Sequence, residues 1–334
     1  THQWVLFFTD RGIAFREKVW QLPEAGPQGR GRSLRQVLQL QEGEGVTAIL
    51  PLPMDEDLWE GLHLVFATVQ GNVRRNRLSD FKNVRSVGLI AMKLDEGDSL
   101  VGVSTCREGD DVMLATRGGK CIRFTADADT LRVFAGRDST GVRGIKLAQG
   151  DAVIALSVLR HVDATTEERA AYLKAAAQRR RAADDEAEAP VVADAEEAVA
   201  EITLSPERFD ALAEAEEILL TVTDAGFGKR SSAHEYRVTG RGGQGIAGIV
   251  LSARTGRDVV ATFPARPGDD IMLVTNGGQL IRLKADDVRL TGRMAMGVTL
   301  MRPAEGERVI SCFPVADEGG DEEAAPAPEE NDNG

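Results

Sequence analysis

The 334-residue sequence is poor in the residue types that build most catalytic and metal centres. Its three cysteines, Cys106, Cys121 and Cys312, stand far apart and form no Cys-x-x-Cys pair, so neither a disulfide framework nor a thiolate metal site is expected. The four histidines lack metal-ligand spacing, and no Gly-x-Ser-x-Gly or phosphate-loop motif is present. We therefore expect no catalytic residue, metal or cofactor in this chain, which by itself is not an enzyme.

Long apolar segments are also lacking. No apolar run approaches the roughly 18 residues that a membrane span needs. The sequence opens directly on a strand-like run, "THQWVLFF", without an initiator methionine or a signal-peptide pattern. With few cysteines as well, we expect a piece of a longer cytoplasmic protein that has no membrane partner.

Negative charge is present but localised. The formal net charge is −13, yet residues 160–217 hold 16 acidic against 7 basic residues, and residues 316–334 hold 8 acidic residues and no basic one. The rest of the chain has 33 basic against 29 acidic residues. The sequence therefore describes a mildly basic body with two acidic appendages.

An eight-residue pattern, Thr-x-x-Gly-x-x-x-Arg, recurs five times, each time after an apolar run. An apolar run followed by a tight turn whose glycine can adopt a positive φ, and then by a second strand, is typical of a β-hairpin. The five threonine, glycine and arginine sets are Thr9, Gly12 and Arg16; Thr68, Gly71 and Arg75; Thr116, Gly119 and Arg123; Thr223, Gly226 and Arg230; and Thr275, Gly278 and Arg282.

Each hairpin is followed by a loop, an apolar strand, an acidic turn and another strand. In three repeats the loop reads Gly-Arg-x-x-x-Gly, starting at Gly136, Gly240 and Gly292. Four short strands in a unit of about 51 residues favour an all-β fold, a β-pinwheel or propeller-like array of about five four-stranded blades. We predict blades 1–3 over residues 1–159 and blades 4–5 over residues 218–315. The repeat argues against a β-solenoid or two β-sandwiches.

The two appendages break the β pattern. Residues 160–217 predict a partly helical, acidic insertion, with one helix capped by Thr166, an acidic low-complexity middle, and a second helix opened by Ser205 and Pro206. A solvated insertion and a regulatory or partner-binding arm both remain open. Residues 316–334 predict a disordered acidic tail, which is either solubilising or able to compete with nucleic acid for the basic body.

Basic residues recur at fixed positions of the repeat, which favours phosphate contacts with duplex DNA bent around a basic rim. Ordinary solvated strand ends are the alternative. The second hairpin strands supply Arg16, Lys18, Arg74, Arg75, Arg77, Lys120, Arg123, Lys229, Arg230, Arg282 and Lys284. The following loops supply Arg30, Arg32, Lys82, Arg85, Arg137, Arg143, Arg237, Arg241, Arg289 and Arg293.

Across all five repeats the sequence resembles the C-terminal domain of DNA gyrase A subunits, through "VLFFTDRGIAFREKVWQLPEAGPQGRGRSL", "NVRRNRLSDF", "STGVRGIKL" and "GFGKRSSAHEYR". The resemblance implies a β-pinwheel whose blades exchange a strand with a neighbour. It also implies noncatalytic wrapping of double-stranded DNA that supports negative supercoiling by an ATP-dependent type IIA topoisomerase. The partners that it implies are double-stranded DNA, the gyrase B subunit and the remainder of the gyrase A subunit. The location that it implies is the bacterial cytoplasm, in association with the nucleoid. ATP, Mg²⁺ and the catalytic tyrosine would belong to other parts of that complex.

The sequence departs from this family in two ways. The insertion at 160–217 is longer than the usual connection. Family members usually have six blades, and the first repeat here is most similar to their second, so the first blade and its Gln-Arg-Arg-Gly-Gly-Lys-Gly box are expected to be absent. A box-like loop remains in the fourth repeat, with a glutamine where the box has its lysine, and we expect it to be a weaker phosphate clamp. Its residues are Gly240, Arg241, Gly242, Gly243, Gln244 and Gly245.

Two alternative functions stay open. The topoisomerase IV C-terminal domain is a near relative of the gyrase domain, with fewer and degenerate blades. A propeller or RCC1-like scaffold that binds proteins belongs to a different class, with a period of about fifty residues as well. A continuous positive outer belt would favour DNA, whereas a neutral rim would favour the scaffold.

Overall fold

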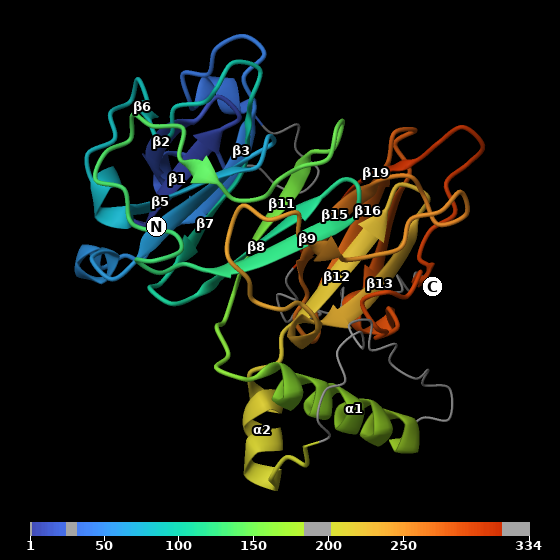
Figure 1. The fold of residues 1–334 in the computed structure, drawn as a ribbon. Helices are drawn as coiled ribbons and strands as arrows, with labels where there is room; N and C mark the ends of the chain where they lie inside the picture. Colours follow the sequence, from blue (N-terminus) through green and yellow to red (C-terminus); the bar gives the residue numbers. More distant parts are fainter. Residues whose placement is uncertain (1, 25–31, 184–201, 316–334) are drawn as a thin grey trace, which may run out of the picture.

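The computed structural model describes residues 2–24, 32–183 and 202–315. Five antiparallel sheets stand side by side in a propeller-like array, and two helices lie outside the sheets (Figure 1). The prediction of an all-β pinwheel or propeller-like fold with a partly helical insertion is confirmed. Arg30, the acidic middle of the insertion (184–201) and the acidic tail (316–334) lie outside the described residues.

Each blade is built on one of the predicted hairpins. Blade 1 contains β1 (Trp4–Thr9), β2 (Ile13–Lys18), β3 (Val46–Pro51) and β6 (Leu89–Ile90). Blade 2 contains β4 (His63–Thr68), β5 (Asn72–Arg77), β7 (Leu100–Cys106) and β10 (Val142–Arg143), and blade 3 contains β8 (Asp111–Thr116), β9 (Lys120–Thr125), β11 (Val153–Leu159) and β14 (Ile246–Ala247). Blade 4 contains β12 (Ile218–Thr223), β13 (Phe227–Ser232), β15 (Val259–Pro264) and β18 (Val298–Thr299), and blade 5 contains β16 (Asp270–Thr275), β17 (Leu280–Lys284) and β19 (Val309–Val315). Short 3-10 turns connect them: η1 (Val19–Gln21), η2 (Leu34–Gln36), η3 (Glu56–Trp59), η4 (Leu78–Phe81), η5 (Ala233–Glu235) and η6 (Ala285–Asp287).

Neighbouring repeats exchange a strand. The two-residue strands β6, β10, β14 and β18 each follow the loop of one repeat but pair with the second hairpin strand of the preceding blade. Each of repeats 2 to 5 therefore contributes three strands to its own blade and one to the preceding blade. In the described residues β17 receives no such strand, so blade 5 has three strands where four were expected.

The repeated threonine and glycine close the hairpin turns. In all five turns the glycine N–H donates to the threonine carbonyl oxygen at 2.9–3.0 Å, and the glycine φ lies between 75° and 87°. The threonine hydroxyl oxygen accepts from the backbone N–H four residues later at 3.1–3.3 Å. At Gly12 and Gly226 a Cβ would also collide with a carbonyl oxygen of the next repeat. The threonine and glycine of the eight-residue pattern are therefore explained by the hydrogen bonds and positive φ of the turn and by its close contact with the next repeat.

Apolar side chains fill the interfaces between blades. Leu6 and Phe8 of blade 1 pack against Phe66 and Phe81 of the second repeat, and the Phe8 and Phe66 rings meet edge to face at 5.6 Å. Similar clusters join blades 2 and 3, 3 and 4, and 4 and 5. The strands β3, β7, β11, β15 and β19 contact one another in that order, and within the described residues no comparable contact joins β19 to β3. The part of the chain that the structure describes is therefore open between blades 5 and 1.

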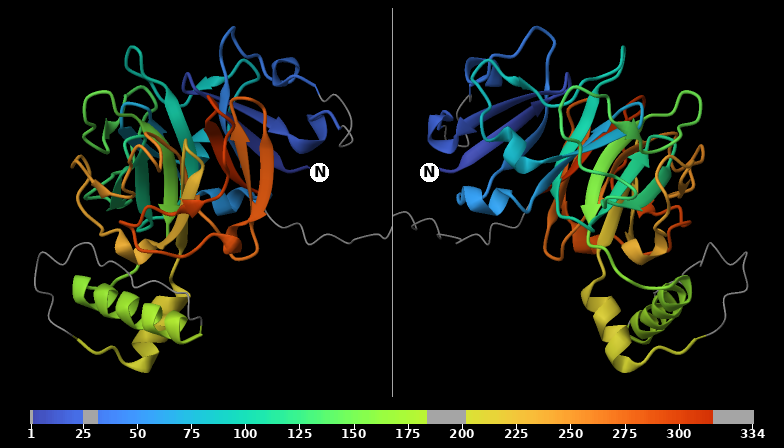
Figure 2. Two further views of the ribbon diagram at one scale, coloured as in Figure 1. Left: turned by 90° about the vertical axis from the view of Figure 1, so that its right-hand side faces the viewer. Right: turned by 60° about the vertical axis from the view of Figure 1, so that its left-hand side comes forward.

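The insertion forms a helical pair under blade 4. Helices α1 (Thr166–Ala183) and α2 (Pro206–Glu214) pack on each other through Tyr172 and Phe209, and α1 contacts η5 (Figures 1 and 2). Ser205 caps α2 as predicted. The cap of α1 is Thr165 and not Thr166, because Thr165 and Glu168 bond reciprocally to each other's backbone N–H. Within the described residues, neither helix is long and apolar enough to cross a membrane.

Replacing Thr116 by valine tests the turn device. The valine preserves the shape but leaves the part-buried N–H of Lys120 without its acceptor, so we expect the free energy of unfolding to fall by about 1–2 kcal/mol. Urea unfolding measures the change, and Thr203→Val on an exposed coil is the matched control. Equal stabilities for the two variants would show that the hydroxyl does not hold the turn.

Candidate nucleic-acid interface

The outer edge of the array is made of the glycine-arginine loops. In the third, fourth and fifth repeats the loop runs beside the second hairpin strand of the preceding blade, with parallel bridges that pair Arg75 with Val133, Arg123 with Val238, and Arg230 with Leu290. The loop then ends in the donated strand. Cations on these loops are therefore placed along the perimeter, where the sequence predicted the DNA.

Five of the predicted DNA-contacting cations are buried instead. Arg74, Arg75, Arg123, Lys229 and Arg293 are between 0% and 3% exposed. A guanidinium or ammonium group that is buried and already bonded to groups within the protein presents no face to a phosphate. Their positions therefore do not support DNA contact, and the structure gives them internal partners.

Arg74 and Lys229 hold the loop of the next repeat. The Arg74 guanidinium donates to the carbonyl oxygens of Arg137 at 2.6 Å and Ser139 at 2.7 Å, and also to that of Gly136. The Lys229 ammonium donates in the same way to the carbonyls of the fifth repeat's loop, those of Gly292, Arg293 and Ala295. These two cations are structural ties between repeats.

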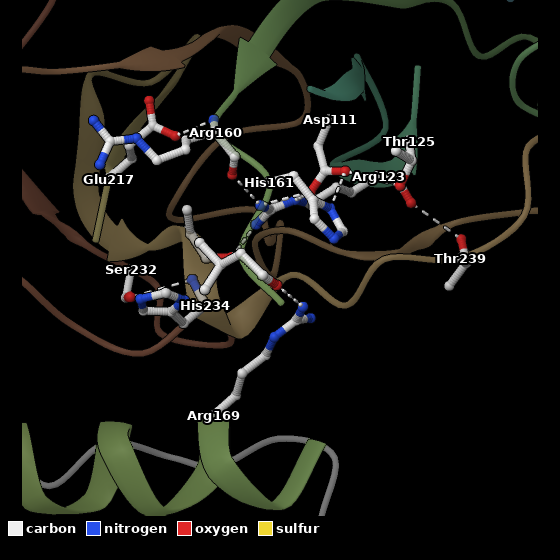
Figure 3. A network of polar contacts seen from close by, with 12 residues as sticks. Asp111, Arg123, Thr125, Arg160, His161, Arg169, Glu217, Ser232, His234 and Thr239 are labelled. Carbon is white, nitrogen blue, oxygen red and sulfur yellow. Dashed lines mark hydrogen bonds and ion pairs between the residues drawn. The ribbon is translucent and has the colours of Figure 1, made fainter. Parts of the chain in front are cut away.

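Arg123 lies at the junction of blade 3, blade 4 and the insertion (Figure 3). Its Nε donates to a carboxylate oxygen of buried Asp111 at 2.8 Å, and its Nη1 donates to the Ala233 carbonyl oxygen at 2.8 Å. The other Asp111 oxygen lies 2.9 Å from Nδ1 of His161, where the insertion begins. Arg75 is tied similarly, to Glu108 at 2.9 Å and to the Ala126 carbonyl.

The loop arginines link neighbouring loops. Arg137 donates to the Asp80 carbonyl, Arg241 to the carbonyls of Thr130 and Arg143, and buried Arg293 to the Ala247 carbonyl. Each arginine thus reaches back to the preceding repeat. The repeated arginine column is explained first by the packing of the array.

The remaining predicted cations are half-buried or exposed. Half-buried are Arg16 and Lys18, which stack on Trp4, Lys82 beside Glu60, Arg137, Arg230 beside Asp286, and Arg289. The exposed ones are Arg32, Arg77, Arg85, Lys120, Arg143, Arg237, Arg241, Arg282 and Lys284. Of these, Arg282 and Lys284 both pair with Asp270, which offsets part of their charge.

Exposed cations gather where two loops touch. The Lys146 N–H donates to the Gly243 carbonyl oxygen at 2.8 Å, and Arg241 donates to the Arg143 carbonyl at 3.1 Å. We call Arg143, Lys146, Arg237 and Arg241 the loop cluster. No acidic residue occurs in the chain between positions 236 and 257, so the fourth-repeat loop is uniformly positive.

Lys146 was missed by sequence reasoning. It is exposed and stands three residues after the end of its donated strand, as do exposed Lys93 and Arg302. The signal was present as a second column of cations. This column lies outside the glycine-arginine template, and several arginines of that template form hydrogen bonds within the protein.

A cavity of about 190 Å³ lies under the box-like loop. It is lined by strand β9 at Cys121, Ile122 and Arg123 and by loop and strand residues that include Gly240, Gly243, Gln244, Gly245 and Ile246. The loop has positive φ at Gly242 and at Gly245, where a Cβ would strike the Cys121 carbonyl. The glycines are therefore required by the close approach of loop and strand.

The fold and its edge define a class: a repeat array of hairpin sheets completed by exchanged strands, with a basic outer edge. Five segments of the chain, 3–53, 62–107, 110–160, 217–263 and 269–316, match the DNA gyrase C-terminal domain, beta-propeller, family. The chain belongs to this family, and the predicted resemblance is confirmed.

Relatives and solved structures agree with that assignment. The chain is 64% identical to the DNA gyrase A subunit of Granulibacter bethesdensis and 43% identical to that of Rickettsia bellii, over 98% and 97% of its length. It spans only 36% and 35% of those proteins. The fold is similar to solved structures of a topoisomerase IV C-terminal domain (TM-score 0.69, 18% identity, 94% of this chain and 79% of that one) and of a DNA gyrase A C-terminal domain (TM-score 0.64, 19% identity, 95% and 83%).

A half-buried acid and a buried base lie behind the fifth-repeat loop. Burial raises the pKa of Glu235 to about 7, although the Arg293 N–H donates to its carboxylate. Burial lowers the pKa of Lys229 to about 8. An acid whose pKa is raised on folding stabilises the fold below its unfolded value and loses that contribution as the pH rises to the folded value.

Glu235→Gln should flatten this pH dependence. Because the pKa of Glu235 rises from its ordinary value of 4.5 to about 7, the wild-type chain should lose stability relative to the variant, on the order of 3 kcal/mol, as the pH rises from about 4.5 to 7. Urea unfolding of both chains across that range measures the difference. A constant difference at every pH would show that Glu235 is not buried as an acid.

Proposed function

We propose that this chain binds and wraps double-stranded DNA along its outer edge, as a part of a type IIA topoisomerase that supports negative supercoiling. The observation that supports this most is the loop cluster, where four exposed cations from two neighbouring loops meet, and where the fourth-repeat loop has no acidic residue. Several cations along an edge favour sequence-independent contact with the phosphate backbone. Membership in the gyrase C-terminal family supports the same function.

The proposed role is noncatalytic. The chain would act by holding DNA, with no cofactor of its own, while strand cleavage and ATP hydrolysis would lie in the gyrase B subunit or in the rest of the gyrase A subunit. These would be its protein partners, in the bacterial cytoplasm at the nucleoid. The relatives, DNA gyrase A subunits that are about three times as long as this chain, support this division of labour.

The box-like loop, Gly240–Gly245, is proposed to take part in DNA binding. Its Arg241 already donates to two carbonyls, so Arg237, Arg143 and Lys146 around it would supply much of the charge. A protein-binding scaffold is the second candidate, favoured by exposed apolar residues such as Trp20 and Met54, which are 60% and 74% exposed in the first repeat. The same chain would then bind protein without dependence on the loop cluster.

The double variant Arg237→Gln, Lys146→Gln tests the DNA proposal. Removing two phosphate contacts should lower the slope of log affinity against log salt by about 2 and reduce duplex affinity by about tenfold near 0.1 M salt. Fluorescence anisotropy with a duplex of mixed sequence, at several salt concentrations, measures both.

Arg266→Gln is the matched control, because Arg266 is exposed in the turn between β15 and β16 and outside the loop cluster. It should leave the salt slope nearly unchanged. Duplex binding that does not depend on salt, or equal effects of the two substitutions, would contradict the proposed interface and favour the scaffold.

A further inference from the structure

One position of the repeat differs between blades, and its residue determines whether the neighbouring loop is hydrogen-bonded from the strand. The residue six positions after the hairpin threonine lies on the second hairpin strand and is Phe15, Arg74, Ile122, Lys229 or Ile281 in blades 1 to 5. In blades 2 to 4 this strand is bordered by the glycine-arginine loop of the next repeat. We call this position the loop-facing position.

In blades 2 and 4 the loop-facing residue is a cation that grips the loop. Arg74 and Lys229 donate to the same three carbonyls of their loops, those of the first, second and fourth residues of the template. Both side chains are fully buried. Charge-assisted bonds to three carbonyls remove the freedom of a loop to change its backbone conformation.

In blade 3 this grip from the strand is missing. The loop is tied instead to the third-repeat loop, because the Gly242 N–H donates to the Gly144 carbonyl oxygen at 2.6 Å and the Lys146 N–H donates to the Gly243 carbonyl oxygen at 2.8 Å. Ile122 has no donor, and the corresponding loop carbonyls are those of Gly240, Arg241 and Gly243. Ile122, Gly240 and Gly243 line the cavity of about 190 Å³ between this loop and the strand, which still approach each other closely at Gly245. The space beside this strand that a gripping side chain fills in blades 2 and 4 is therefore partly empty here.

The same loop is the richest in glycine of the three template loops. Four of its six template residues are glycines, whereas the loops starting at Gly136 and Gly292 have two each. Gly242 has a φ of +82°, while the equivalent residues Asp138 and Met294 do not have a positive φ. Glycines lower the cost of moving between backbone conformations, and the cavity gives the loop room to move inward.

We propose that the loop-facing position determines how rigidly each outer loop is held for DNA, with Arg74 and Lys229 as positioning residues. The loop over Ile122, Gly240–Gly245, is the adaptable one, and it changes conformation into the cavity beneath it when the duplex presses on the loop cluster. The grip itself does not depend on DNA, whereas the adaptation rests on the proposed DNA-binding function. Rigid loops on either side fix the path, and the adaptable loop accommodates sequence-dependent duplex shape.

Hydrogen exchange of the three loops tests the grip without DNA. In peptides that cover 240–245, the amides other than that of Gly242, which donates to the Gly144 carbonyl oxygen, should exchange at least about tenfold faster than those of peptides that cover 136–141 and 292–297 in the wild-type chain. Ile122→Lys should slow exchange of 240–245 by about tenfold, and Lys229→Met should speed exchange of 292–297 by a similar factor. Lys229→Met removes a buried ammonium group, and Ile122→Lys adds one. The two variants test the grip in opposite directions, so one variant still tests it if the other folds poorly.

The duplex arm uses the same peptides with and without a duplex of about 30 base pairs, long enough to bend along the edge. Duplex should slow exchange of 240–245 in the wild-type chain and have little further effect on that loop in Ile122→Lys. Equal exchange of the three loops without DNA, or no response to Ile122→Lys, would overturn the grip. Grip effects that are present with no duplex response in any loop would leave the positioning of the loops standing and overturn both the adaptation and the proposed function.

Discussion

The structure depends on the unpaired edge that every hairpin leaves. The second hairpin strand has one row of backbone N–H and C=O groups that its own repeat does not pair, and buried groups of this kind require partners. The next repeat supplies them with a two-residue strand and the loop before it. No blade from 1 to 4 is therefore complete without its successor, and the outer edge of the array is made of the segments that complete it.

This constraint divides the basic residues into two groups. The buried cations of the second hairpin strands bond within the array: Arg74 and Lys229 donate to carbonyls of the loop that covers them, and Arg123 holds the junction with the insertion. Cations on the outside of the loops remain available to solvent, and the loop cluster collects four of them. The buried cations fix the loops of neighbouring repeats, and these loops carry the exposed cations that are available to phosphate.

The hairpins were predictable because the turn leaves its requirements in the sequence: a glycine for positive φ and a threonine for the N–H four residues on. The exchange of strands was implied only by resemblance, since a two-residue strand such as Ile246–Ala247 has no periodicity of its own. The burial of Arg74 and Arg75 could not be predicted, because residues on both faces of a blade are covered by neighbours or loops. The packing of the insertion under η5 depends on Tyr172 and His234. Their ring centroids are 5.1 Å apart, although the two residues lie far apart in the sequence.

The division between tying and binding cations is tested most directly by amine acetylation of the folded chain with and without duplex DNA, read out by mass spectrometry. Lys120 and Lys146, exposed on the strand and loop of the outer edge, should react freely and be protected by DNA. Lys174 on the insertion should react equally in both conditions, and buried Lys229 should react in neither. Reaction of Lys229 that DNA suppresses, or unchanged reactivity of Lys120 and Lys146 in a DNA-bound chain, would contradict this account.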